Sequence, residues 1–279
     1  MPTHIRQMEA ADLNFAAHCT DAVGWAGETR EVFESFFARE PEGCRIAEIE
    51  GRPIGMCVSV AYRHSGFLGE LIVMEEWRGR GIGRELLEDG IRYLRDKGIE
   101  SIYLDGVPRA VPLYERAGFE RICRSLRFHG RPTGRADPRV RRMRARDLPA
   151  VCALDREHFG EDRSFFLRQR LERHPDCCWI LEEDRRIAEF VIGRRCPGAV
   201  AAGPWVIRAD REPTGAVLLP MNEETLWIGV LETNASAARV LRDRGFSLRD
   251  DPPWRMVLGG NRGLGESLGC CAIGSAAKG

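Results

Sequence analysis

Apolar positions recur with two different periods along the first half of the chain, and their order predicts an α/β protein. His4–Met8 has the pattern of an opening strand, and helical spacing follows over Glu9–Cys19 and again from Thr29 through Phe37. Cys44–Ile49 and Ile54–Val60 are short apolar runs on either side of a Gly-Arg-Pro turn, which predicts an antiparallel hairpin. Strands and helices in this order predict a mixed sheet covered by helices.

The next stretch combines a strand, a turn and a helix. Its strand is a short run of branched apolar residues, Leu71, Ile72 and Val73. Its turn is rich in glycine and arginine, and comprises Arg78, Gly79, Arg80, Gly81, Ile82, Gly83 and Arg84. Apolar residues from Ile82 to Leu94 then recur at helical spacing, so a helix is expected to end near Gly98.

This turn is suited to hold an anion. Glycines let a ligand approach the backbone N–H groups, the helix N-terminus adds partial positive charge, and the arginines add full charges. A P-loop is excluded because no Lys-Ser or Lys-Thr pair follows the glycines, and a dinucleotide fingerprint would need glycine at Arg84. What remains is R-x-x-G-x-G, which is either a cradle for a pyrophosphate or a glycine-rich surface turn that carries arginines.

Between its strand and its helix, this hexamer resembles the acyl-CoA cradle of the GNAT superfamily of N-acetyltransferases. A second run, LYERAGF from Leu113 to Phe119, resembles the Tyr that this family places in a helix before Gly-Phe. The resemblance implies that Tyr114 lies near the thioester sulfur as a general acid; the alternative is an aromatic ring that packs the helix. The longer run LDGVPRAVPLYERAGF also resembles a bacterial subfamily with two GNAT-like units, although Gly106-Val107 replaces its Ala-Thr.

The resemblance implies acetyl-CoA as co-substrate and an amine, small molecule or peptide, as acceptor. Backbone groups of residues 71–73 would hold the pantetheine arm, and residues 78–84 the pyrophosphate. Glu70 is a candidate general base for the amine, acting directly or through water, or else a surface strand residue. Trp25, in a glycine-flanked loop, is expected either to line the acceptor pocket or to pack on the core.

The second half repeats the order of the first, which predicts two tandem GNAT folds: residues 1–129, a linker over 130–138, and residues 139–279. Its counterpart of the cradle is Arg208–Glu212, which has no glycine and carries two acidic residues, and a helix is expected over Glu212–Leu219. Leu241 stands where Tyr114 would be. We therefore expect the second unit to bind no CoA, and to shape the acceptor pocket or stabilise the first unit.

The joint between the halves is basic, with ten arginines between Arg121 and Arg146. Such a run can contact nucleic acid, but it has no interleaved aromatic residues, so a solvated joint is expected instead. One of these arginines could also reach the 3′-phosphate of CoA.

Length and charge fit this picture. A chain of 279 residues has room for two domains, and its net charge of zero gives it no bias toward nucleic acid or membrane surfaces. It has no apolar run of the ~20 residues that span a bilayer and no apolar leader, so a cytoplasmic protein is expected. No cluster of His, Cys or Asp has the spacing of metal ligands, so no metal is expected. The alternative to an N-acetyltransferase is a non-catalytic acyl-CoA sensor or interaction module.

Overall fold

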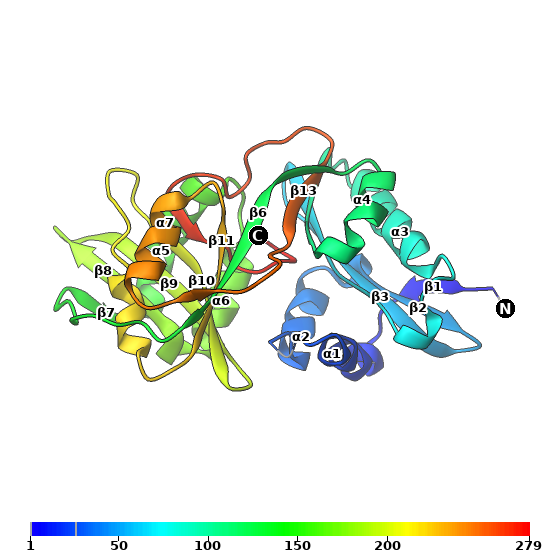
Figure 1. The fold of residues 1–279 in the computed structure, drawn as a ribbon, viewed down its shortest axis with the longest axis horizontal. Helices are drawn as coiled ribbons and strands as arrows, with labels where there is room; N and C mark the ends of the chain where they lie inside the picture. Colours follow the sequence, from blue (N-terminus) through cyan, green and yellow to red (C-terminus); the bar gives the residue numbers. More distant parts are fainter. Residues whose placement is uncertain (1, 26) are drawn as a thin grey trace.

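The two halves of the chain lie side by side and share one continuous sheet (Figure 1). The computed structural model describes residues 2–25 and 27–279. The first half contains β1 (His4–Gln7), α1 (Leu13–Ala22), α2 (Arg30–Arg39), β2 (Cys44–Ile49), β3 (Arg52–Ala61), β4 (Ser65–Val73), α3 (Ile82–Asp96), β5 (Ser101–Gly106), α4 (Val111–Arg116) and β6 (Glu120–Gly130). The predicted mixed α/β fold is confirmed.

The second half follows the same order from residue 140. It contains β7 (Val140–Arg142), α5 (Leu148–Phe159), α6 (Ser164–Arg173), β8 (Cys178–Glu183), β9 (Arg186–Cys196), β10 (Ala199–Ile207), the 3₁₀-helix η7 (Ala216–Met221), β11 (Leu226–Leu231), α7 (Ala235–Asp243), β12 (Ser247–Leu248), β13 (Trp254–Leu258) and β14 (Cys270–Ala272). The main path of the sheet is β1-β2-β3-β4-β5-β13-β6-β11-β10-β9-β8-β7.

Strand β13 belongs to the second half in sequence but completes the sheet of the first half. It lies between β5 and β6 and is antiparallel to both. The long strand β6 makes this exchange possible, because its first part pairs with β13 while residues 125–130 pair with β11 (Figure 1). The division into residues 1–129 and 139–279 stays a prediction, and β13 crosses it.

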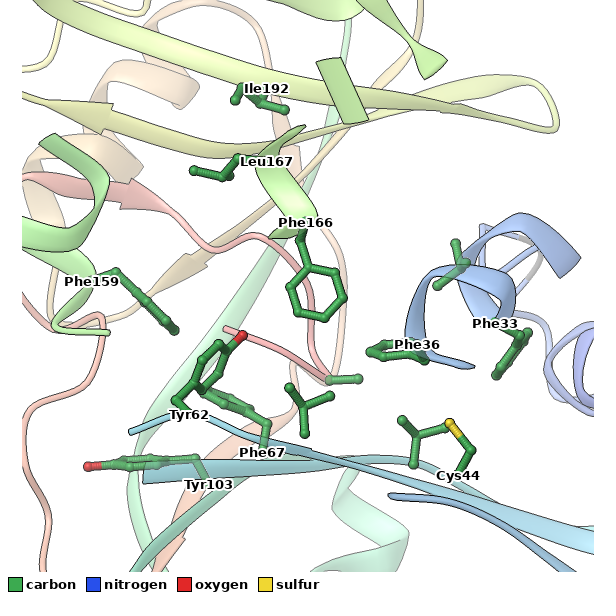
Figure 2. Close-up of a cluster of buried hydrophobic side chains, with 14 of the residues drawn as sticks. Phe33, Phe36, Cys44, Tyr62, Phe67, Tyr103, Phe159, Phe166, Leu167 and Ile192 are labelled. Carbon is green, nitrogen blue, oxygen red and sulfur yellow. The ribbon is translucent and has the colours of Figure 1, made fainter. Parts of the chain in front are cut away.

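A shared hydrophobic core holds the halves against each other. Tyr62 of the first half meets the ring of Phe159 at α5, with ring centroids 5.6 Å apart, and Phe36 on α2 meets Phe166 on α6 at 6.0 Å (Figure 2). Aromatic pairs of this kind bury large apolar areas. This shared core fixes the position of one half relative to the other, and with it the shape of any cavity between them.

Two expected elements differ in the structure. The strand predicted over Leu71–Val73 begins six residues earlier, at Ser65. The helix expected over Glu212–Leu219 is wrong, because only the 3₁₀-helix Ala216–Met221 forms, with Pro220 inside it and Gly215 at a φ of 63° before it. Gly215 lies inside the expected range, and its left-handed conformation is incompatible with an α-helix through it. Pro220 removes a backbone donor and disfavours the α conformation of Leu219, so the short helix does not extend as an α-helix.

None of the described helices combines the length and the apolar content that crossing a membrane requires.

Candidate functional site

Strands β4 and β5 separate and leave a gap in the sheet of the first half. They pair in parallel only over Ser65–Phe67 and Ser101–Tyr103. The register between β3 and β4 shifts next to Glu70, which has a φ of 51°, so β4 carries a bulge there. A bulge bends its strand and redirects side chains, and it accounts for the separation. From Leu68 onward, the edge of β4 that faces β5 has no strand partner within the described part of the chain.

The glycine turn at the end of β4 is an open backbone cradle. Gly79 and Gly81 have φ values of 76° and 86°, a region that residues with a Cβ rarely adopt. No atom lies within 4 Å of the position that a Cβ would take at Gly79. The backbone N–H groups of residues 79–83 donate to no acceptor in the described part of the chain, and the last two begin α3. Free donors at a helix N-terminus suit a diphosphate.

The arginines of this turn are exposed, and their contacts stiffen it. Arg78 Nε donates to the carbonyl of Val73 at 2.9 Å, which ties the turn to the end of β4. The Arg80 guanidinium lies 4.7 Å from the ring centroid of Trp77, and Arg84 pairs with Glu88 at 3.4 Å along α3. The residues at 78–84 therefore fit the pyrophosphate of an acyl-CoA, with backbone donors inside and positive charge around them.

Tyr114 lies on α4 beside the end of β5, where its ring packs against Gly106. It is 7% exposed, and its ring makes an edge-on contact with Phe119 at 6.0 Å. A Cβ at Gly106 would lie 2.9 Å from two atoms of this ring, so the glycine of the Gly106-Val107 departure makes room for it. Burial raises the pKa of the Tyr114 phenol, which keeps it protonated. Tyr114 is absent from the walls of the cavity between the halves.

Glu70 is buried, not a surface strand residue. Its side chain is 6% exposed, and Oε2 has no hydrogen-bond partner among the described residues. Burial and then the Glu28 carboxylate raise the pKa of Glu70 to about 8, against the opposing charges of Lys278 and Arg194. A carboxyl with such a pKa can exchange a proton near neutral pH, as a general base must.

A cavity of about 450 Å³ opens between the halves beside Glu70. Trp25 and Glu70 both line it, and Trp25 also packs against the shared core. Its other walls include Glu28 from the first half and Arg194, Trp227 and Arg249 from the second half. Volumes of this size are typical of sites for small molecules.

Two family models match the chain. One, described as the acetyltransferase (GNAT) family, matches residues 10–119, and the other, described as an acetyltransferase (GNAT) domain, matches residues 151–266. The glucosamine 6-phosphate N-acetyltransferase of Trypanosoma brucei brucei is 32% identical over 138 residues, which are 44% of this chain and 93% of that protein. The chain belongs to the GNAT acetyltransferase family.

Other relatives match only part of their own length. A mycothiol acetyltransferase of Stackebrandtia nassauensis is 31% identical over 133 residues, which are 44% of this GNAT chain and 43% of the relative. An uncharacterised N-acetyltransferase of Methanocaldococcus jannaschii is 30% identical over 106 residues, 34% of this chain and 46% of that one. The chain thus spans less than half the length of these two curated relatives.

Two solved structures share the fold over more than nine-tenths of the chain. A crystal structure of a putative acetyltransferase from Pyrococcus horikoshii aligns with a TM-score of 0.84 at 23% identity, over 99% of this chain and 96% of that one. A GCN5-related N-acetyltransferase from Sphaerobacter thermophilus aligns with a TM-score of 0.65 at 16% identity, over 92% and 95%. The two family-model matches confirm the predicted pair of GNAT units, and these structures share the overall fold.

The second GNAT unit has closed its own gap. Strands β4 and β5 of the first unit pair over a short stretch and then separate. Strands β10 and β11 likewise pair in parallel over two residues each, 200–201 and 226–227, and then separate. Here β14 enters beside them: it pairs with Trp205 and Val206 of β10, and the N–H of Ile273 donates to the carbonyl of Gly229 on β11 at 2.9 Å. The chain itself therefore occupies the place that stays open in the first unit.

The turn after β10 also lacks the features of a cradle. Arg208 is engaged by Asp210 at 2.6 Å, and no α-helix begins at this turn to aim its N–H groups. Leu241, which replaces the tyrosine, is a fully buried apolar residue of α7. Both features agree with the expectation that the second unit does not bind acyl-CoA. Its residues line the cavity instead.

The residues after β14 pack against β4 of the first unit. Ala277 lies so close to Gly69 that a Cβ there would be 2.3 Å from the Ala277 Cβ, which explains the glycine. Lys278 is buried, with its ammonium 4.3 Å from the Phe36 ring centroid. This places an amino group near Glu70 and Glu28, and burial lowers its pKa well below the usual range of a lysine, against the opposing effect of the two carboxylates.

The sequence indicated only part of the cavity. The structure places Trp25 and Glu70 at its wall, and the turn 78–84 at the end of the strand that carries Glu70. Reasoning from the sequence missed Glu28, Arg194 and Lys278. Glu28 follows Trp25 by three residues, but nothing in its local pattern indicates a partner 166 residues away.

Proposed function

We propose that this protein transfers the acetyl group of acetyl-CoA directly to an amine that binds in the cavity between its two units. The carrying observation is the position of Glu70. It lies on the bulge of β4, where the open gap of the first unit meets the cavity. One strand thereby presents its free edge to a thioester arm and its carboxyl to an acceptor.

The donor side rests on the gap and the cradle. The unpaired edge of β4, including Leu71, Ile72 and Val73, would hold the pantetheine arm, and the turn 78–84 the pyrophosphate. The free N–H groups of residues 79–83 support this assignment. The names of the relatives, which include mycothiol, glucosamine 6-phosphate and N-alpha-acetyltransferases, support acetyl transfer as the chemistry.

The acceptor is mostly an ammonium ion at neutral pH and must lose a proton before it attacks. Glu70 in its carboxylate form takes that proton. The amine nitrogen then forms a bond to the acetyl carbon, and a backbone N–H on the free edge of β4 stabilises the oxyanion. The C–S bond breaks as the intermediate collapses, and Tyr114 donates its proton to the leaving thiolate. The acceptor nitrogen releases its second proton to solvent, and Tyr114 regains a proton from solvent. The products are the N-acetylated acceptor and CoA.

The experiment is a screen of amines with acetyl-CoA, in which thiol release is measured against the water background. Glu70→Gln keeps the shape of the side chain and removes the base, so turnover should fall by about 10²–10⁴-fold. Affinity for acetyl-CoA, measured by calorimetry, should be retained. Glu223→Gln, at an exposed residue away from the cavity, is the matched control. Binding of acetyl-CoA with no amine-dependent thiol release would instead support a non-catalytic acyl-CoA sensor.

A further inference from the structure

The cavity is lined by four ionisable side chains that leave hydrogen-bonding atoms free within the described part of the chain. Two of them, Glu28 and Glu70, are an acidic pair. Two others, His129 and Arg249, are a basic pair. Because all four side chains line one cavity of about 450 Å³, a single small molecule can touch both pairs.

The acidic pair has two free oxygens. Oε1 of Glu28 accepts a hydrogen bond from Arg194 at 2.7 Å, which fixes the carboxylate. Oε2 of Glu28 and Oε2 of Glu70 are both buried and accept no hydrogen bond from any described residue. A buried carboxyl oxygen without a donor is costly, and an amine supplies the missing N–H groups.

The basic pair comes from β6 and from the segment that follows β12. His129 is paired with Ser247 in the sheet, and the N–H of Arg249 donates to the carbonyl of Arg127 at 2.8 Å. The two residues are therefore neighbours. Both side chains are exposed, and neither forms an ion pair or a side-chain hydrogen bond within the described part of the chain.

The other arginines of the cavity are already neutralised. Arg127 pairs with Asp105 at 2.7 Å, and Arg194 pairs with Glu28 at 2.7 Å. Structural ion pairs therefore account for these two cations but not for Arg249. A guanidinium presents parallel N–H groups that match a carboxylate or a phosphate, and it is the residue type suited to bind either one.

We infer that the acceptor carries an anionic group, a carboxylate or a phosphate, in addition to its amine, and that Arg249 with His129 binds this group. The inference rests on the proposed function and specifies its acceptor. The amine faces Glu28 and Glu70, and the anion faces the basic pair. Trp25 and Trp227 supply apolar walls for the part of the molecule between the two groups, and the cavity volume of about 450 Å³ limits its size.

The test uses amines that differ only in the second group. β-Alanine is compared with β-alaninamide, and O-phosphoethanolamine with ethanolamine, by the kcat/KM of thiol release. The anionic member of at least one pair should react about 10- to 100-fold better, as a charge-assisted hydrogen bond allows. The two comparisons also distinguish a carboxylate from a phosphate.

Variants of Arg249 test the role of the basic pair. Arg249→Gln should reduce the preference for the anionic member to about 3-fold or less, and Arg249→Glu should reverse it. Arg239→Gln, at an exposed arginine of α7 outside the cavity, is the control and should keep the preference. The affinity of each variant for acetyl-CoA, measured by calorimetry, should equal that of wild type, because the cradle is unchanged.

Equal or better reaction of both neutral members would overturn the inference, as would a preference that survives in Arg249→Glu. If no amine promotes thiol release, the proposed function fails. Binding of the same four compounds to the protein saturated with CoA then decides the inference by itself. Tighter binding of an anionic member supports it, and equal binding within each comparison contradicts it.

Discussion

Arg194 on β9 donates a hydrogen bond to Glu28, in the loop before α2, with 2.7 Å between Nη2 and Oε1. A second N–H group of Arg194 donates to the carbonyl of Gly27. This arginine of the second unit thus fixes a carboxylate of the first unit beside Glu70. Because like charges disfavour each other at short range, the position of Glu28 affects the ionisation of Glu70.

Glu28→Gln should move the pH dependence of turnover to lower pH. The substitution removes a negative charge that raises the pKa of Glu70, while the positive charge of Arg194, which lowers it, stays. Removal of the Glu28 charge lowers the pKa of Glu70, so the base becomes available at lower pH. The measurement is kcat against pH for wild type and variant, with Glu223→Gln as control. An unchanged or alkaline-shifted profile would show that Glu28 does not tune the base.

The stability of the protein should depend on Glu70 between pH 4.5 and about 8. The folded state holds a proton on Glu70 up to about pH 8, whereas the ordinary pKa of a glutamate, which applies in the unfolded chain, is 4.5. The contribution of the neutral form is therefore complete below pH 4.5 and is lost as the pH rises to about 8. Glu70→Gln stays neutral throughout. As the pH rises over this range, the free energy of unfolding of Glu70→Gln should therefore increase relative to that of wild type, by at most about 1.4 kcal/mol per pH unit.

Denaturant unfolding of both proteins at pH 5, 7 and 8.5 checks this expectation. The difference between the two free energies should grow toward pH 8.5, and the other titrating groups largely cancel in the comparison. A difference that stays constant across the three values of pH would mean that Glu70 ionises in the folded protein as it does in the unfolded chain.

Tyr114→Phe should lower turnover with little change in affinity for acetyl-CoA. The hydroxyl makes no hydrogen bond to a described residue, whereas the ring packs against Phe119 and Gly106, and phenylalanine keeps that packing. Loss of a general acid reduces kcat by about 10²–10⁴-fold. Tyr93→Phe on α3 is the control, because it removes a hydroxyl that bonds Glu40 instead. Wild-type turnover in Tyr114→Phe would exclude the tyrosine as the acid.

Acetyl-CoA should bind at one site per chain, and Gly79→Ala should weaken it. Gly79 and Gly98 have φ values of 76° and 78°, and at both positions a Cβ would meet no atom within 4 Å. Alanine at either position therefore costs about 1–2 kcal/mol of folding free energy through the backbone alone.

Only Gly79 belongs to the cradle, so calorimetry should show weaker acetyl-CoA binding in Gly79→Ala but not in Gly98→Ala. Two bound molecules per chain would contradict the closed gap of the second unit. Equal affinity in the two variants would instead move the pyrophosphate away from residues 78–84.

The sequence by itself determined the features that depend on neighbouring residues. The turn 78–84 follows from its glycines, because a backbone with positive φ selects glycine whatever surrounds it. Neighbouring residues also indicate the repeated order of strands and helices. They show as well that Arg208–Glu212 has no glycine and so cannot form the same turn. These features predicted the family and the donor side of the site.

Only the tertiary structure decided how the two units combine. Trp254 of β13 pairs with Gly106 of β5, Ile273 reaches β11, and Arg194 meets Glu28, and each contact joins residues far apart in sequence. Such pairings depend on which strand edge is free and which buried charge lacks a partner, and local periodicity carries no information about either. The charges of the cavity, including the pKa of Glu70, arise from those long-range contacts. The acceptor side of the site therefore became visible only in the fold.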